Sequence, residues 1–251
     1  DPTSALTMLG LFSLGHKFGV IVNRFINAPF NSFWAPRKME LLLNEDPASR
    51  KTIARVCTYA TFLTVYVALG MTAGIESLIH ILADPKYYGA HVVVPFVASS
   101  YIALGLETHF TTGLVYRKKT IWATYASVIG LAVVLIWNYI FIPRYGLIGA
   151  ATSNLAGFAI RTSIIYVASQ KLFHIPFEIW RILHLFAVAL GLYFLVQLIS
   201  TESPWSTFFI RTGLAALYPL ALYMTGFFSS GEQDQFYRII GKIFIRERQS
   251  V

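Results

Sequence analysis

Charge is scarce in this sequence. Only 13% of its 251 residues are Asp, Glu, Lys or Arg, whereas 56% are hydrophobic and 16% are aromatic. A water-soluble domain of this length needs more charge to cover its surface. The mean hydropathy is +0.59. These values exclude a disordered chain, a coiled coil and an ordinary soluble domain, and they are typical of an integral membrane protein.

Motifs that carry chemistry are also scarce. The one cysteine, Cys57, excludes a disulfide framework and a cysteine-based metal cluster. The sequence contains no Walker loop and no GxGxxG, HExxH, GxSxG or EF-hand pattern. His80 and Asp84 are separated by three residues, whereas the acyltransferase His-x4-Asp box requires four. We therefore expect no ATP-driven motor, no catalytic residue, no metal site and no cofactor in this chain.

What the sequence does contain is a series of long apolar runs, separated by Pro, Gly or short polar clusters. A helix needs about 20 apolar residues to span a bilayer, and backbone groups in lipid must pair within their own segment. The alternating pattern of membrane β-strands is missing. The sequence therefore predicts an all-α fold, a polytopic membrane helical bundle of about seven transmembrane helices. The expected spans are Ala5–Trp34, Thr52–Ala73, Val92–Tyr116, Ile121–Ile142, Leu147–Ser169, Ile182–Ser200 and Trp205–Phe228.

The net charge of +8 is distributed unevenly between the loops. The second and fourth loops hold only Lys86 and Arg144, and the sixth holds no Lys or Arg. This bias predicts that the odd-numbered loops and the C-terminus are cytoplasmic. It indicates membrane topology and contact with anionic lipid head groups, and we expect no nucleic-acid partner. The cations of the odd loops and the tail are Arg37, Lys38, Arg50, Lys51, Arg55, Arg117, Lys118, Lys119, Lys171, Arg181, Arg238, Lys242, Arg246 and Arg248.

Seven spans with a cytoplasmic C-terminus place the N-terminus outside. The chain begins DPTSAL, without Met or a signal peptide. We therefore expect it to be the C-terminal piece of a longer protein with an odd number of spans upstream; a full-length gene that starts at Asp1 would refute this. The tail from Glu232 to Arg248 has the pattern of an amphipathic surface helix.

The first span carries a stripe of polar residues. On a helical wheel they fall within an arc of about 120°, and the rest of the helix is mostly apolar or small. Intramembrane cations are costly, so such a stripe suggests a helix face that lines a wet cavity. Arg grips phosphate with two hydrogen bonds, and amides pair with hydroxyl groups, so the stripe suits an anionic, hydroxyl-rich ligand such as a sugar phosphate. The stripe consists of Ser13, His16, Lys17, Asn23, Arg24, Asn27 and Asn31, and the candidate binding residues are Lys17, Arg24, Asn23, Asn27 and Asn31.

Other interpretations of these residues stay open. Lys17 and Arg24 could pair with carboxylates or carbonyl groups only to hold helices together, and the long stem of Lys17 could reach the interface. Glu107 is the one acidic residue deep in an expected span. It could be the counter-ion of Arg24 or Lys17, or a proton carrier. His16 and His109 could exchange protons near neutral pH or make helix–helix hydrogen bonds.

The fifth span adds two further candidates for substrate binding. Asn154 and Arg161 are seven residues apart and share a helix face. The small residues between Gly146 and Gly157 predict close helix packing. Pro29 and Pro95 predict bends in their helices. Arg211, early in the last span, is expected to reach the outer interface.

Three stretches resemble a known family. Gly10–Leu42 (GLFSLGHKFGVIVNRFINAPFNSFWAPRKMELL) resembles a span that runs from a GLYSLAYK-like start to a PF..AW.P end. Ile136–Gly157 (IWNYIFIPRYGLIGAATSNLAG) resembles an N..LIP.YG..GAA..T corner, and Gln170–Leu183 (QKLFHIPFEIWRIL) resembles a Q..Y.IPYEW.R re-entry. These patterns belong to the O-antigen and capsule polysaccharide flippases of the multidrug/oligosaccharidyl-lipid/polysaccharide exporter superfamily. The sequence departs from them at Phe12, where Tyr is common, and at Ile179, where the family has a YEW run.

This resemblance implies an organisation. Members have twelve or fourteen spans with cytoplasmic termini, so this chain is similar to spans eight to fourteen, the C-terminal lobe of a two-lobed flippase. Residues 1–173 would form the transport lobe without its first helix, residues 174–230 two accessory helices, and residues 231–251 a cytoplasmic amphipathic tail.

The resemblance also implies a function. It is the translocation of undecaprenyl-diphosphate-linked oligosaccharide across the bacterial inner membrane for surface polysaccharide (O-antigen, lipopolysaccharide) biosynthesis, by ion-coupled alternating access. The implied partners are that glycolipid, membrane lipids, the missing N-terminal half, and the polysaccharide polymerase and chain-length proteins.

Two alternative functions remain. A membrane-embedded lipid-linked glycosyl- or acyltransferase would need acids or histidines gathered in the outer loops, which offer only Glu76, His91, Asp84 and Glu202. A cation-coupled multidrug antiporter of the same superfamily would need acidic cavity residues, whereas the stripe is basic.

Overall fold

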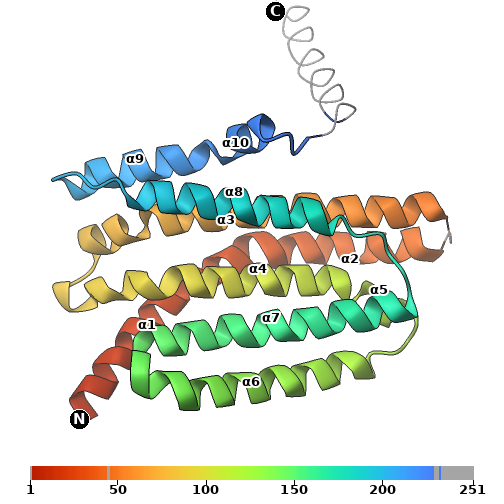
Figure 1. The fold of residues 1–251 in the computed structure, drawn as a ribbon, viewed down its shortest axis with the longest axis horizontal. Helices are drawn as coiled ribbons and strands as arrows, with labels where there is room; N and C mark the ends of the chain where they lie inside the picture. The colour runs from red at the N-terminus through yellow and green to blue at the C-terminus, as the bar shows by residue number, and fades with distance from the viewer. Residues whose placement is uncertain (1, 44–45, 229–231, 233–251) are drawn as a thin grey trace, which may run out of the picture.

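The computed structural model describes residues 2–43, 46–228 and 232. The described part of the chain contains helices and turns and no β-strand (Figure 1). The predicted all-α fold is confirmed. The elements are α1 (Pro2–Val22), the π-helical η1 (Asn23–Asn27), α2 (Ala28–Leu43), α3 (Pro47–Leu82), the 3₁₀-helical η2 (Pro85–Val93), α4 (Val94–Phe110), α5 (Thr112–Tyr116), α6 (Ile121–Tyr145), α7 (Leu147–Leu172), α8 (Ile179–Gln197), α9 (Pro204–Ala216) and α10 (Tyr218–Met224).

Each expected span is mostly helical, but α8 ends at Gln197 and α10 at Met224, before the expected span ends at Ser200 and Phe228. Five helical segments are long and apolar enough to cross a membrane: Pro47–Leu82, Pro85–Tyr116, Ile121–Tyr145, Ile179–Gln197 and Pro204–Met224. Helix α7 is also long, with 26 residues, but Asn154 and Arg161 lower its hydropathy. On α6 most apolar side chains point outward, including Leu131 and Leu135, as expected for a helix that faces lipid. These features are those of a membrane protein.

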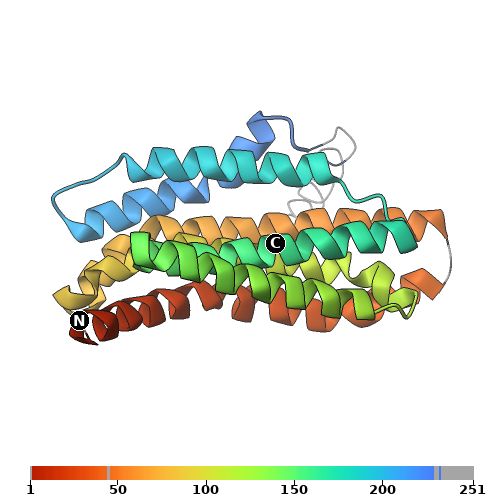
Figure 2. The same ribbon diagram turned by 60° about the horizontal axis from the view of Figure 1, so that its bottom comes forward.

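The helices lie roughly side by side along the long axis of the molecule (Figures 1 and 2). Helix α6 packs along α7, α7 packs on α4, and α4 contacts both α1 and α3. Helices α8 and α9 contact α3 and form a second layer, which Figure 2 shows above the other helices. The predicted small-residue packing on α7 is present at Gly157, where a Cβ would overlap the side chain of Val134 on α6.

The helix ends and turns that carry most of the described cations meet at one end of the bundle, which we call the basic end. The α2–α3, α5–α6 and α7–α8 connections lie there, whereas Lys86 and Arg144 lie in elements that meet at the opposite end (Figure 1). The uneven distribution of Lys and Arg between the loops therefore corresponds to a difference in charge between the two ends of the folded bundle. Which end faces the cytoplasm stays a prediction. The expected amphipathic tail lies outside the described residues, apart from Glu232.

The two prolines that predict bends act differently. Pro29 is the second residue after η1. At the end of η1 the Ala28 N–H donates to the Asn23 carbonyl five residues earlier. Proline has no N–H, and its ring crowds the carbonyl four residues before it, which explains the wider π turn at this point. Pro95 lies instead in the first turn of α4, where a missing N–H is tolerated, so it starts a helix and does not bend one.

Candidate functional site

Two glycines determine which face of α1 points into the bundle. A Cβ on Gly15 would come within 2.7 Å of the Ala90 carbonyl oxygen, and one on Gly19 would overlap the Val97 side chain. Val22, on the same helix face, is fully buried. Helical periodicity puts Lys17 and Arg24 nearly opposite this packing face, whereas His16 and Asn27 lie closer to it. The two cations of the stripe therefore point away from the α1–α4 contact.

The two cations of the stripe lie on the surface of the described chain. Lys17 and Arg24 are both exposed, as is Ser13. Neither cation makes a hydrogen bond or ion pair with any residue that the structure describes. Asn23 and Asn31 are half-buried, and their side-chain amides likewise have no hydrogen-bond partner within the described ranges.

Arg24 lies deep within the span. It is close enough to Tyr101 on α4 to act on its hydroxyl electrostatically. Asn27, one helical turn further on, donates from Nδ2 to the Tyr101 carbonyl oxygen at 2.8 Å. Tyr101 is near the middle of the span Pro85–Tyr116. Arg24 is therefore at mid-span depth, where a charged side chain in contact with lipid would cost the most free energy.

The other cations of the bundle that lie away from the helix ends have partners among the described residues, and one of them, Lys38, differs from expectation. Arg211 is 5% exposed, pairs with a carboxylate and donates from Nε to the Ile199 carbonyl in the α8–α9 connection. Lys38 does not lie in a loop: α2 continues to Leu43, and the Lys38 ammonium is buried. The contacts are Arg161 Nη2 to Glu107 Oε1 at 2.5 Å, Arg211 Nη1 to Glu76 Oε2 at 2.5 Å, and Lys38 Nζ to the Thr108 carbonyl oxygen at 3.0 Å.

Lys17 and Arg24 therefore differ from Arg161, Arg211 and Lys38, because the latter three have bonding partners among the described residues and the former two do not. A cation at the centre of a membrane helix costs about 2.5–3.5 kcal/mol even by the lowest scale, and it normally faces water or a partner group. This fold supplies partners for Arg161, Arg211 and Lys38. It supplies none for the two stripe cations within the part of the chain that the structure describes. Their face therefore requires water or polar groups from outside the described residues.

Glu107 is a counter-ion, but its partner is Arg161 on α7 and not Lys17 or Arg24. Glu107 is 6% exposed, and its second oxygen, Oε2, has no partner among the described residues. Arg161 is about one-third exposed, and its Nε is also unpaired. The pair holds α4 to α7 by a charge-assisted hydrogen bond.

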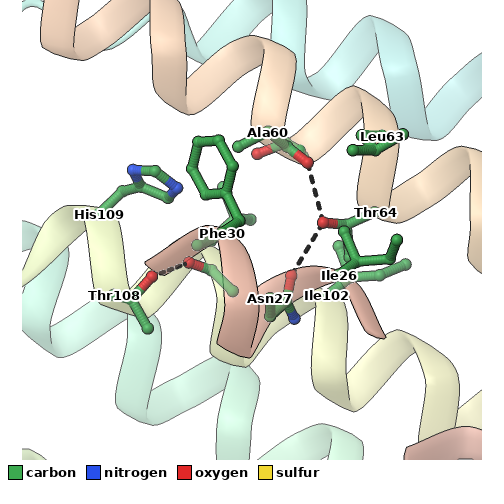
Figure 3. A pocket seen from close by; sticks show the side chains of 12 residues that line it. Ile26, Asn27, Phe30, Ala60, Leu63, Thr64, Ile102, Thr108 and His109 are labelled. Carbon is green, nitrogen blue, oxygen red and sulfur yellow. Dashed lines mark hydrogen bonds between the residues drawn. The ribbon is translucent and has the colours of Figure 1, made fainter. Parts of the chain in front are cut away.

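The Asn27 side chain connects neighbouring helices, a structural role that the helical wheel of the first span did not predict (Figure 3). Its Oδ1 lies 2.9 Å from the Thr64 hydroxyl, which also lies 2.8 Å from the Ala60 carbonyl oxygen. A Cβ on Gly105 would come within 2.9 Å of the Asn27 side chain. The side chain thus ties η1 to α3 and α4. The adjoining pocket has a volume of about 10 Å³, room for about one water molecule and too small for a sugar.

We therefore expect Asn27→Ala to destabilise the protein, by about 1–3 kcal/mol, because it removes hydrogen bonds to two neighbouring helices. Asn31→Ala is the matched control, since Asn31 has no partner within the described residues, and it should leave stability unchanged. Thermal unfolding of the detergent-purified protein measures both. Equal melting temperatures for the two variants would contradict the structural role.

Two aromatic residues connect the stripe to α7. The Tyr101 ring lies between His16 and Phe158, with centroid distances of 6.1 Å and 6.4 Å. The Arg161 guanidinium lies 5.9 Å from the centre of the Phe158 ring. The predicted residue Asn154 is one turn before Phe158 and shares its face. The structure therefore brings His16, Arg24 and Arg161 to one side of the bundle, with Tyr101 and Phe158 between them.

Sequence reasoning missed Tyr101 and Phe158. The chain has 14 Tyr and 20 Phe, so two more in apolar spans carry no distinguishing pattern. His109, in contrast, lies away from this surface. It is 4% exposed, packs against Phe30 at 6.0 Å, and its Nδ1 has no partner among the described residues.

A separate cleft of about 740 Å³ opens between α3, α4 and α8. Its walls are mostly apolar, and Glu76, His91 and Arg211 add polar groups. Lys17 and Arg24 are not among its lining residues. The cleft and the stripe are therefore distinct features.

Comparison with known proteins gives no relative: no family model, no curated protein and no solved structure matches this chain.

Proposed function

We propose that this chain is part of a membrane transporter that moves lipid-diphosphate-linked oligosaccharides across the bilayer for surface polysaccharide biosynthesis. The observation that carries the proposal is the contrast between cations. Arg161 and Arg211 are paired with carboxylates, whereas Lys17 and Arg24 stay exposed and unpaired on one face of the first span, within the described residues.

The chemistry of this face suits the head group of such a lipid. A diphosphate carries the negative charge that two fixed cations attract, and Arg can hold a phosphate with two hydrogen bonds. The free amides of Asn23 and Asn31 suit sugar hydroxyls. Lys17 and Arg24 are seven residues apart, about 10 Å along the helix axis. They would offer two successive positions to an anion that crosses the membrane.

The sequence resemblance supports the same proposal and supplies its mechanism. In this reading the chain is the C-terminal lobe, a second lobe covers the stripe, and rocking of the two lobes opens the passage to each side in turn. We also propose that the protein lies in the bacterial inner membrane with a cytoplasmic C-terminus, that transport is coupled to an ion, and that the protein is a transporter and not an enzyme.

A binding experiment tests the proposal. We expect the purified full chain to bind undecaprenyl diphosphate in mixed micelles, and Arg24→Ala to weaken binding by about tenfold or more, the loss of a charge-assisted hydrogen bond. Arg144→Ala is the matched control, because Arg144 is also exposed and lies outside the stripe. Equal affinity of the Arg24→Ala and Arg144→Ala proteins, or chemical conversion of a lipid-linked sugar by the wild type, would contradict the proposal.

A further inference from the structure

The basic end of the bundle carries a second cationic surface, which we call the basic pad. Arg50 lies in the first turn of α3, and three consecutive cations follow α5. Lys171 lies in the last turn of α7. The pad consists of Arg50, Arg117, Lys118, Lys119 and Lys171, none of which forms an ion pair with a described residue.

Two arginines of the pad share one aromatic ring. The guanidinium carbon of Arg50 lies 4.3 Å from the centre of the Phe173 ring, and that of Arg117 lies 5.4 Å from it. The two charges are therefore less than about 10 Å apart, within the span of one phospholipid head group. The ring stabilises each cation but does not neutralise it. An anion between them would relieve their repulsion.

The backbone around Phe173 holds this arrangement in place. Gly113 allows α5 to approach α7 closely, since a Cβ there would overlap Ser169 and come within 3.2 Å of the Phe173 carbonyl oxygen. Lys118 adopts a left-handed conformation with φ of +54°. The N–H groups of Lys118 and Lys119 donate to carbonyls of α5 at 3.0 Å and 2.9 Å. Three of the five pad cations, Arg117, Lys118 and Lys119, therefore lie in a turn whose backbone is held by hydrogen bonds, so the backbone needs little reordering to bind a ligand.

The first turns of α6 indicate the depth of the pad in the membrane. Trp122 and Tyr125 are exposed there, with ring centroids 6.0 Å apart. Exposed Trp and Tyr occupy the boundary between head groups and hydrocarbon. Further along α6, Val128 and Leu131 are exposed apolar residues suited to lipid chains. The pad, one turn before Trp122, is thus at the level of the lipid head groups.

We propose that the basic pad binds the phosphate of an anionic phospholipid, between Arg50 and Arg117, with the acyl chains along the exposed face of α6. The charge of the pad, its rigid turn and the adjoining lipid-facing helix all fit this ligand. The proposal does not depend on the proposed function, because the pad and the stripe share no residue.

Native mass spectrometry of the full chain from mixed micelles tests the site. The wild type should retain phosphatidylglycerol in preference to phosphatidylcholine. The double variant Arg50→Gln/Arg117→Gln should lower phosphatidylglycerol retention about tenfold, because it removes both charge-assisted contacts. Arg37→Gln/Lys51→Gln is the matched control: it removes two exposed cations from the same end and should retain the lipid.

Arg50→Lys/Arg117→Lys, which keeps the charge and the fold, should restore part of the binding. Wild-type retention by the double Gln variant, equal retention of phosphatidylcholine by the wild type, or displacement of the lipid by millimolar inorganic phosphate would each overturn the proposal. The last outcome would identify a site for soluble phosphate.

Discussion

If the proposed function holds, replacement of Arg24 with alanine is expected to reduce surface polysaccharide between about tenfold and a hundredfold. The estimate corresponds to the loss of charge-assisted hydrogen bonds to a phosphate, about 1.5–3 kcal/mol. Arg24 is the candidate at mid-span depth, and no described residue neutralises it. Arg24→Lys should give an intermediate loss, since an ammonium keeps the charge but not the two-pronged geometry of a guanidinium.

Surface polymer is measured by gel electrophoresis, with the level of transporter protein in the membrane as the reference. Arg144→Ala should leave polymer unchanged, since Arg144 is exposed at the end of the bundle opposite the basic end. Wild-type polymer in both Arg24 variants would remove Arg24 from the proposed site.

The second large effect is expected on stability, at the ion pair between α4 and α7. Glu107→Ala leaves the Arg161 guanidinium without its carboxylate in the interior of the bundle. Breaking a buried pair by removing one partner costs about 3–5 kcal/mol, and partial exposure of Arg161 places this case near the lower value. We therefore expect the melting temperature in detergent to fall by about 6–10 °C.

An exposed pair of the same type provides the control for Glu107. Arg37 and Glu40 form an i,i+3 ion pair at 2.8 Å on α2, with both side chains more than 60% exposed. Such pairs contribute about 0–1 kcal/mol, so Glu40→Ala should barely change the melting temperature. The double variant Glu107→Leu/Arg161→Met should recover much of the loss, because it removes both charges. If Glu107→Ala proved as mild as Glu40→Ala, the pair would not hold the two helices together.

The spans were predictable because length and hydropathy are local properties of the sequence. Each expected run is mostly helical, and the charge asymmetry of the loops matches the two ends of the bundle. The irregularity near Pro29 was also predictable, since the effect of a missing N–H is local. The π-helical geometry of Asn23–Asn27 was not predictable, because it depends on how η1 packs against α3 and α4.

Pairings between distant residues were not predictable from one sequence. Glu107 and Arg161 are 54 positions apart, and nothing local favours Arg161 over Arg24 as the partner. The helical wheel placed Asn27 within the polar stripe. It did not show that the Asn27 side chain is hydrogen-bonded to the Thr64 hydroxyl and the Tyr101 carbonyl. The burial of Lys38 depends likewise on the Thr108 carbonyl of another helix.

The central claim is that the stripe face of the first span borders water at mid-membrane depth, and cysteine accessibility in native membranes tests it most directly. The chain is suited to this measurement because its one cysteine, Cys57, is fully buried. Thiols react as thiolates, which form in water and not in hydrocarbon. Arg24→Cys is compared with Leu135→Cys, on the lipid-facing helix α6, where the native side chain is 61% exposed.

We predict that a membrane-impermeant maleimide labels the cysteine at position 24 readily, and that the cysteine at position 135 stays unlabelled. Labelling at position 24 should also slow when undecaprenyl diphosphate is added. Equal resistance of both positions to the reagent would mean that the stripe faces lipid or dry protein, and would contradict the claim that it lines an aqueous passage.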